Sequence, residues 1–207
     1  RLVYEEESLL WDLPAPGLPG SHQIINAGLA AAAARACGFE EAAVREGLRT
    51  VEWPGRLQRL SAGPLAAVAR EGGAELWLDG GHNPAAGEAL ASSLGQMRGA
   101  GDRPLVLISA FGMNKDAAAF LAYFEGLAAR LIAVSFTGGR EGMQSAQAVA
   151  EAARKAGLPA QTSAGLEEAV HDALEDYERP RILICGSLYL AGAVLALGGA
   201  GEIHTTP

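Results

Sequence analysis

The part of this sequence best suited to chemistry is a short polar segment, Asp79-Gly80-Gly81-His82-Asn83-Pro84. A carboxylate directly after an apolar run can bind ribose hydroxyls or a cationic group, and two glycines let a ligand or another backbone come close. His82 can hold an anion or orient an amine. In the alternative interpretation, Asn83 caps the next helix, Asp79 accepts hydrogen bonds from loop amides, and His82 is solvated. Either way, Pro84 suits the first position of a helix.

Further polar candidates precede this segment. Arg56 follows Trp53-Pro54-Gly55, and its planar guanidinium can reach a phosphate, although a surface salt bridge is the alternative. Gln23 and Asn26 lie on the first turns of an Ala-rich helix, and His22 shares a face with Asn26. Side-chain amides at such a place can read the edge of a base such as adenine. The alternative is helix capping and hydrogen bonds between domains.

Two candidates follow other apolar runs. Ser187 precedes a helix, so its hydroxyl can bind a carboxylate or simply cap that helix. Lys115 and Asp116 are interpreted as an ordinary helix start. The chain contains no phosphate-loop motif, no dinucleotide-binding glycine motif after the first parallel strand, no His-Glu-x-x-His and no Gly-x-Ser-x-Gly. We therefore assign no catalytic residue and no metal ligand, and a hydrolase or dehydrogenase has little support.

These candidates need a scaffold, and the hydrophobic pattern predicts one. Apolar runs alternate with helical patterns through the second half of the chain, which indicates a parallel sheet covered on both faces. We predict strands at 75–78, 105–110, 131–136, 160–163 and 182–185, and helices at 84–97, 116–129, 145–156, 166–177 and 188–197.

The region before the parallel sheet has a different pattern. A short strand region at 2–13 leads into a helical pair at 22–37 and 40–49, with Ser21 as the first N-cap and Gly38 after the first helix. Two short runs at 56–61 and 65–70 predict an antiparallel hairpin at one edge of the sheet. The fold class is therefore α/β, Rossmann-like, with domains at 1–52 and 53–207.

In open α/β sheets, ligands bind beyond the carboxyl ends of the parallel strands. This rule selects four strand-end segments, which are 79–84, 111–116, 137–140 and 186–187. Asp79, His82 and Ser187 all lie in these segments, so one edge of the predicted sheet is expected to carry the site.

Composition excludes several functions. A net charge of −8 disfavours a nucleic-acid surface. Cys37 and Cys185 lack Cys-x-x-Cys spacing and lie in apolar runs, so we predict buried free thiols in a reducing, cytoplasmic compartment and no zinc site. The stretch 182–201 carries no charge, but Gly186 and Ser187 interrupt it, which favours a strand and a helix over a membrane span.

Five motifs in order resemble the folylpolyglutamate/dihydrofolate synthase family of the Mur ligase superfamily. They run from about residue 13 to 190, covering most of the chain. They are Ser21-His22-Gln23-Ile24-Ile25-Asn26-Ala27, Trp53-Pro54-Gly55-Arg56-Leu57, Leu78-Asp79-Gly80-Gly81-His82-Asn83-Pro84, Phe111-Gly112-Met113 with Lys115-Asp116, and Gly186-Ser187-Leu188-Tyr189. One departure is Gly81, where the family usually has alanine. We expect this change to leave both neighbouring polar side chains undisturbed.

The resemblance implies the C-terminal part of an ATP-dependent ligase that joins L-glutamate to dihydropteroate or a reduced folate through an acyl phosphate. Family members are about twice as long, and their N-terminal ATPase half carries the phosphate loop and the magnesium ligands. The resemblance assigns nucleotide contacts to Gln23, Asn26, Arg56 and Asp79, and glutamate contacts to His82 and Ser187. It also implies a monomer.

Two alternatives stay open. A Mur-type cell-wall amino-acid ligase shares the fold and the strand-end Asp and His. The second alternative is a non-catalytic domain that binds nucleotide or glutamate. This chain alone is expected to be inactive, because it has no phosphate loop.

Overall fold

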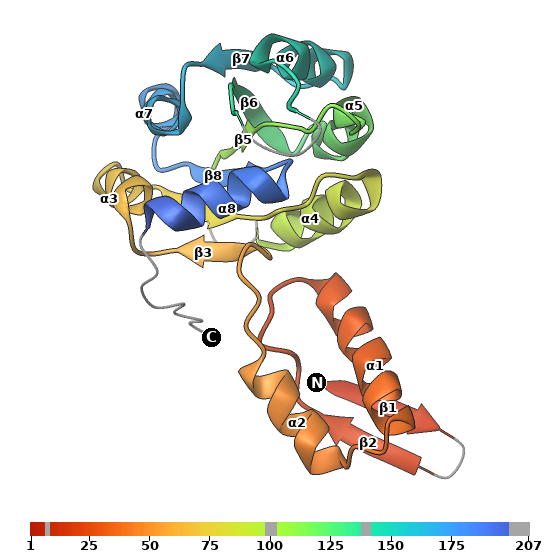
Figure 1. Cartoon of the computed structure of the whole chain (residues 1–207). Coiled ribbons are helices and arrows are strands. Elements are labelled where there is room, and N and C mark those ends of the chain that lie inside the picture. Colours follow the sequence, from red (N-terminus) through yellow and green to blue (C-terminus); the bar gives the residue numbers. More distant parts are fainter. Residues whose placement is uncertain (7–8, 98–102, 138–141, 199–207) are drawn as a thin grey trace. The chain divides into compact units, whose positions relative to one another are not determined.

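The computed structural model describes residues 1–6, 9–97, 103–137 and 142–198. They form two compact units, of which the first ends at Pro54 and the second begins at Gly55 (Figure 1).

The first unit is a hairpin followed by two helices. Strands β1 (Leu2–Glu6) and β2 (Leu9–Leu13) pair antiparallel, and helices α1 (Ser21–Ala36) and α2 (Glu41–Thr50) follow. The predicted helical pair is thus confirmed to within one residue. Its small core consists of Trp11, Leu13, Ala27, Ala31, Val44 and Leu48.

The two ends of α1 differ from the prediction at Ser21 and Cys37 and agree with it at Gly38. Gly20, with φ 108°, is the N-cap in place of Ser21, which is the first helical residue and makes no capping bond. Gly38 has φ 85°, so the predicted left-handed residue after the helix is confirmed. Cys37 is exposed, and the prediction of a buried thiol there was wrong. It is the C-cap of α1, directly after the last helical residue, and it is not part of the small core.

The second unit is a six-stranded sheet with helices on both faces. Its elements are β3 (Gln58–Leu60), α3 (Pro64–Glu71), β4 (Glu75–Leu78), α4 (Pro84–Met97), β5 (Leu105–Ser109), α5 (Ala117–Leu121), the 3-10 helix η2 (Ala122–Phe124), β6 (Ala128–Val134), α6 (Ala146–Lys155), β7 (Ala160–Ser163), α7 (Leu166–Asp176), β8 (Arg181–Cys185) and α8 (Leu188–Leu197). The strand order is β3-β4-β8-β5-β6-β7, and only β3 is antiparallel to its neighbour.

Each face of the sheet has its own apolar core. On one face, α4, α5 and α6 pack on alternate strand residues such as Leu107 and Leu183. On the other, α3, α7 and α8 pack on the intervening residues, such as Ile108 and Ile182. Strands β5 and β8 are buried along their whole length, as the continuous apolar runs predict. The Rossmann-like fold class is confirmed.

Two local predictions in this unit were wrong. The second half of the expected hairpin is helix α3, with Pro64 in its first turn, and the antiparallel edge is made by β3 with β4. Short apolar runs fit a strand or a buried helix equally well. The expected helix at 116–129 stops early, because Gly126 turns the chain with φ 69° and Ala128 pairs with Leu105. Sheet pairing there overrides the helix propensity of alanine.

The uncharged stretch after Ile182 forms a buried strand and a helix, as predicted, as far as residue 198. The residues after 198, and residues 138–140 of the third strand-end segment, lie outside the described residues. Within those residues, no helix is both long enough and apolar enough to cross a membrane.

The sheet order creates a natural opening beside β8. The helices that follow β4 and β5 cover one face, whereas the helix that follows β8 covers the other. The loops after these three neighbouring strands therefore diverge at the carboxyl edge. Open α/β sheets bind ligands in the crevice between loops that diverge in this way.

Candidate functional site

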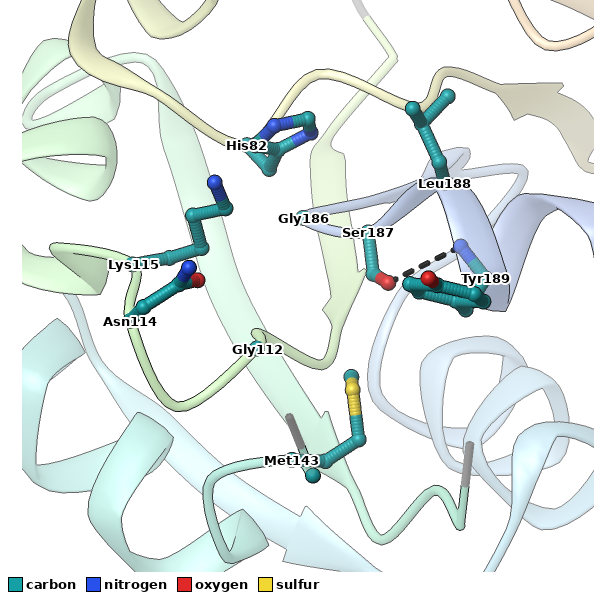
Figure 2. A pocket seen from close by; sticks show the side chains of 10 residues that line it. His82, Gly112, Asn114, Lys115, Met143, Gly186, Ser187, Leu188 and Tyr189 are labelled. Carbon is teal, nitrogen blue, oxygen red and sulfur yellow. Dashed lines mark hydrogen bonds between the residues drawn. The ribbon is translucent and has the colours of Figure 1, made fainter. Parts of the chain in front are cut away.

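A cavity of about 270 Å³ lies at this carboxyl edge (Figure 2). Residues from the loops after β4, β5, β6 and β8 line it. They are His82, Gly112, Asn114, Lys115, Gly142, Met143, Gly186, Ser187, Leu188 and Tyr189. Two sequence candidates, His82 and Ser187, are thus brought together in one concave site.

Backbone hydrogen bonds fix the loops after β4 and β8 against each other. The amide of Gly186 donates to the carbonyl of Gly81 at 2.9 Å. Gly186 has φ 101°, and a Cβ there would lie 2.8 Å from the carbonyl oxygen of Ala110. Glycine is therefore required both by backbone conformation and by space. This close approach sets the floor of the cavity.

Gly80 permits a second close approach. A Cβ on Gly80 would lie 2.4 Å from Cδ2 of Leu188 and 3.3 Å from Nη1 of Arg56. Its amide donates to the carbonyl of Gly55 at 2.9 Å. The strand-end glycine therefore joins the first turn of α8 to the chain segment that carries Arg56.

Asp79 is buried, with 4% of its surface exposed. Its two carboxylate oxygens accept hydrogen bonds from the amides of Leu57 at 2.7 Å and Gly81 at 2.6 Å. The interpretation in which Asp79 satisfies loop amides is therefore confirmed. The carboxylate ties the residue after Arg56 to the end of β4.

Arg56 is half-buried, and its guanidinium donates to the carbonyl of Gly55 at 3.2 Å. Among the described residues, its guanidinium takes part in no ion pair, so the expected alternative of a surface salt bridge is not formed there. Four donors remain for an anionic group.

His82 has a defined orientation at the cavity. Its Nδ1 lies 2.8 Å from the carbonyl oxygen of Gly80. A carbonyl can only accept, so Nδ1 carries the hydrogen and Nε2 is left for a ligand. Next to it, Asn83 accepts a hydrogen bond from the amide of Ala86 at 2.9 Å, which confirms the predicted cap of α4.

Ser187 is the N-cap of α8. Its hydroxyl oxygen accepts hydrogen bonds from the amides of Tyr189 at 3.1 Å and Leu190 at 3.4 Å. The capping interpretation is confirmed, but it leaves the hydroxyl hydrogen available. Because the hydroxyl also lines the cavity, the start of α8 offers an anion one O–H donor together with the positive end of the helix dipole.

Sequence reasoning missed Lys115. Lys115 and Asp116 have different roles in the structure. Asp116 caps α5, because its carboxylate accepts a hydrogen bond from the backbone amide of Ala119 at 2.9 Å. Lys115 lines the cavity, and its side chain extends towards His82 (Figure 2). Within the described residues its ammonium forms no ion pair. The usable signal was a lysine in a strand-end segment, directly before the N-cap.

The remaining candidates lie in the first unit. Gln23 is buried, and its side-chain oxygen accepts a hydrogen bond from the side-chain nitrogen Nδ2 of Asn26 at 3.0 Å. Asn26 is exposed and keeps its own side-chain oxygen available. The pair presents one amide surface on the first turns of α1.

Cys185, at the end of β8, is close to the site but unsuited to chemistry. Burial raises the pKa of its thiol to about 12, although a contact with the hydroxyl of Ser109 at 3.4 Å lowers it in part. The thiol stays protonated at neutral pH and fills the core. The described residues contain no cluster of three or more His, Cys, Asp or Glu side chains that could hold a metal ion.

A doubly wound, mostly parallel sheet, with a cavity at its switch point, defines the Rossmann-like class of α/β domains. Residues 66–197 of the second unit match the family described as "Dihydrofolate synthetase, C-terminal domain". The chain belongs to this family.

Relatives agree with this assignment over more of the chain. Folylpolyglutamate synthase of Lacticaseibacillus casei is 28% identical across 96% of this chain and 44% of its own length. A probable bifunctional folylpolyglutamate synthase/dihydropteroate synthase of Halobacterium salinarum is 40% identical over 80 residues, which are 38% of this chain and 9% of that protein. The chain thus spans less than half of either relative.

Solved structures show the same arrangement. Folylpolyglutamate synthase of Mycobacterium tuberculosis, in complexes with ADP and AMPPCP, superposes with a TM-score of 0.75 at 29% identity, over 93% of this chain and 43% of that one. The Thermotoga maritima folylpolyglutamate synthase gives 0.67 at 27% identity, over 96% and 44%.

Proposed function

We propose that this chain is the C-terminal portion of an ATP-dependent ligase that adds L-glutamate to dihydropteroate or a folate. The observation that carries the proposal is the cavity beside β8. An ammonium, a hydroxyl, an imidazole nitrogen and the start of a helix converge there, and all four suit an amino acid with two carboxylates. The family match favours the folate branch over a Mur-type cell-wall ligase.

In this proposal, His82 and Ser187 bind glutamate as the resemblance implies, and Lys115 joins them. The Ser187 hydroxyl hydrogen, at the positive end of the α8 dipole, takes one carboxylate, and the Lys115 ammonium takes the other. His82, oriented through its Nδ1, then lies beside the amino group. Holding the amine in one orientation lowers the entropy cost of its attack.

For the nucleotide, we propose that Arg56 contacts the ribose–phosphate part and that Gln23 and Asn26 contact adenine. The ADP and AMPPCP complexes of the Mycobacterium tuberculosis relative support nucleotide use. Asp79 was assigned to the ribose, but its deep burial and two amide contacts support a different role. We propose that it holds the Arg56 segment in place, with any ribose contact secondary.

The reaction proceeds in two steps. The carboxylate of the pteroate or folate takes the γ-phosphoryl group of ATP, which gives an acyl phosphate and ADP. The neutral amine of glutamate then attacks the acyl carbon, the bond to the phosphate oxygen breaks, and an amide and inorganic phosphate form. Magnesium would neutralise charge on the phosphates, with ligands from the ATPase half. Loops that exclude water protect the acyl phosphate.

The domain roles follow the same logic. We propose that the first unit completes a central ATPase domain and that the second is the glutamate-binding ligase domain. A monomeric protein of the cytoplasm fits a ligase that consumes ATP and carries two free cysteines.

The test is ATP-dependent joining of L-glutamate to dihydropteroate and to a reduced folate, with magnesium, using this purified chain. Folylpolyglutamate synthase of Lacticaseibacillus casei is the positive control. We expect no product from this chain, but we expect L-glutamate to shift the amide NMR signals of His82 and Ser187. Turnover by this chain, or the absence of any glutamate-induced shift, would contradict the proposed division of roles.

A further inference from the structure

The loop that carries Lys115 is held from outside by one side chain. Gln144 lies in the segment after β6, just before the N-cap of α6. Its side-chain nitrogen donates to the carbonyl oxygens of Gly112 at 2.9 Å and Lys115 at 2.8 Å. A primary amide has two N–H donors, so this nitrogen uses both of them on the same loop.

Backbone contacts strengthen the same connection. The amide of Gln144 donates to the carbonyl of Phe111 at 2.8 Å, and the amide of Met113 donates to the carbonyl of Gly142 at 3.2 Å. Gly112 and Met143 form an isolated antiparallel bridge. The segment 142–144 thus fixes the loop 111–115 from its first residue to its last.

We propose that Gln144 is a positioning residue for the glutamate site, acting through Lys115. This inference rests on the proposed function. Gln144 holds the backbone carbonyl of the residue whose ammonium enters the cavity, so loss of its two donors lets the loop move and the ammonium leave the place where a carboxylate would bind. Only a side-chain amide of this length suits the role, because a carboxylate cannot donate and asparagine is one methylene shorter.

The variants separate geometry from charge. Gln144→Met removes both donors at similar length without adding charge, and Gln144→Glu places a carboxylate against two carbonyl oxygens. Gln147→Glu is the matched control, because Gln147 is exposed on α6 and its side chain donates a hydrogen bond to Glu151 on the same helix. It adds the same charge three residues away and leaves the loop contacts intact.

Three measurements on the 207-residue chain report the effect. Amide hydrogen exchange at Met113 and at position 144 reports the loop. The chain has two lysines, so ¹³Cε-lysine labelling gives one signal for Lys115 and one for Lys155 as an internal control. Titration with L-glutamate gives the Kd, and the thermal midpoint reports overall stability.

For Gln144→Met we expect amide exchange at these two positions to rise about tenfold, as for a locally opened loop. The Lys115 signal should shift while that of Lys155 does not, and the glutamate Kd should rise about tenfold with the thermal midpoint nearly unchanged. Gln144→Glu should have a larger effect. Gln147→Glu should match the wild type in amide exchange, in the Lys115 signal and in the glutamate Kd, and its thermal midpoint should fall only slightly because the new carboxylate faces Glu151.

Unchanged exchange and an unchanged Lys115 signal in both Gln144 variants would overturn the positioning role, whatever glutamate does. If the loop loosens but the wild-type chain shows no response to L-glutamate, the glutamate assignment fails while the hold of Gln144 on the loop stands. A glutamate Kd that rises equally in Gln144→Glu and Gln147→Glu, but not in Gln144→Met, would attribute the effect to charge and would also contradict the proposal.

Discussion

Lys115 shows how much of the site depends on the direction of one side chain. The chain has two lysines, and the other one, Lys155, is exposed at the end of α6 and can serve as a control. The two differ in place and not in chemistry, so they form a matched pair for testing the cavity.

We expect Lys115→Ala to weaken L-glutamate binding about tenfold, the effect of losing one charge-assisted hydrogen bond. Lys155→Ala should leave the Kd unchanged, because its ammonium lies outside the cavity. Isothermal titration or NMR titration of the three proteins measures the difference. Equal affinities for Lys115→Ala and wild type would remove Lys115 from the site.

Glycine 186 is the second decisive residue. Gly186→Ala forces a left-handed conformation on alanine and drives a Cβ against the Ala110 carbonyl, so we expect a loss of about 1–3 kcal/mol in the free energy of unfolding. Gly192→Ala is the control, since a Cβ there meets nothing within 4 Å in the middle of α8 and should stabilise by about 0.5–1 kcal/mol. Urea denaturation distinguishes the two, and equal stabilities would refute the steric argument.

Gly81 stands where the family usually has alanine. The glycine was expected to leave the neighbouring polar side chains undisturbed, and it leaves room for one of them, since a Cβ here would lie 2.8 Å from Oδ1 of Asp79 and 3.0 Å from Cβ of Ala86. A small residue that looks neutral in a motif is thus packed against the very carboxylate that organises the loop.

At the scale of elements, the start of α8 combines a structural and a binding role. Ser187→Ala removes an N-cap and should cost about 1 kcal/mol of stability, and Ser145→Ala at the N-cap of α6 should cost a similar amount. Only the first lies on the cavity, so only Ser187→Ala should also raise the L-glutamate Kd. Thermal unfolding and titration of both variants test this, and equal glutamate affinity would leave Ser187 with capping alone.

The opposite edge of the sheet carries a charge network. The Glu75 carboxylate accepts a hydrogen bond from Arg181 at 2.8 Å and also lies near Arg59 and Arg103. Burial raises the pKa of Glu75, but the bond and charge of Arg181, with Trp77 and Arg103, outweigh it, so the pKa lies below its ordinary value. A lowered carboxyl pKa stabilises the fold at pH values above the unfolded pKa.

We expect Glu75→Gln to lose about 2 kcal/mol at pH 7, the size of a hydrogen bond between charged groups. The difference from wild type should shrink as the pH falls below the ordinary glutamate pKa of roughly 4.3 and vanish below the lowered one. Urea denaturation across pH gives this curve. A difference that stays constant with pH would exclude the ionised carboxylate as its source.

The sequence predicted elements better than contacts. The alternation of buried strands and helices from Glu75 onward depends on hydrophobic period, which a sequence displays directly. Helix α3 and the early end of α5 were missed because sheet pairing and packing, and not local propensity, decide them. The site was predicted in part, because His82 and Ser187 lie at strand ends. The loop that carries Lys115 is instead bonded to Gln144, about thirty residues away in sequence, and no local pattern reveals that contact.

For the whole molecule, the two units differ in how well they can stand alone. The second has two apolar cores, whereas the core of the first consists of six residues. On α1, Ile25 is 69% exposed and Leu29 is 67% exposed, which suits a surface that other residues cover in a longer protein.

We therefore expect an excised segment of residues 55–207 to unfold cooperatively, with a thermal midpoint close to that of the main transition of the 207-residue chain. An excised segment of residues 1–54 should show no cooperative transition, because so small a core cannot offset the entropy of ordering the chain. Circular dichroism melts of both segments decide this. A cooperative melt for residues 1–54 alone would contradict the expectation that the first unit cannot fold by itself.

The position of β8 also sets an order of events on the ribosome. This strand lies between β4 and β5, yet it is the last strand of the sheet to be synthesised. Before β8 is present, β3 with β4 and β5 with β6 and β7 have no strand to connect them, and the edges of β4 and β5 that pair with β8 in the complete fold have no partner. The two groups of strands can join only after β8 has been synthesised, so the sheet closes late in chain order.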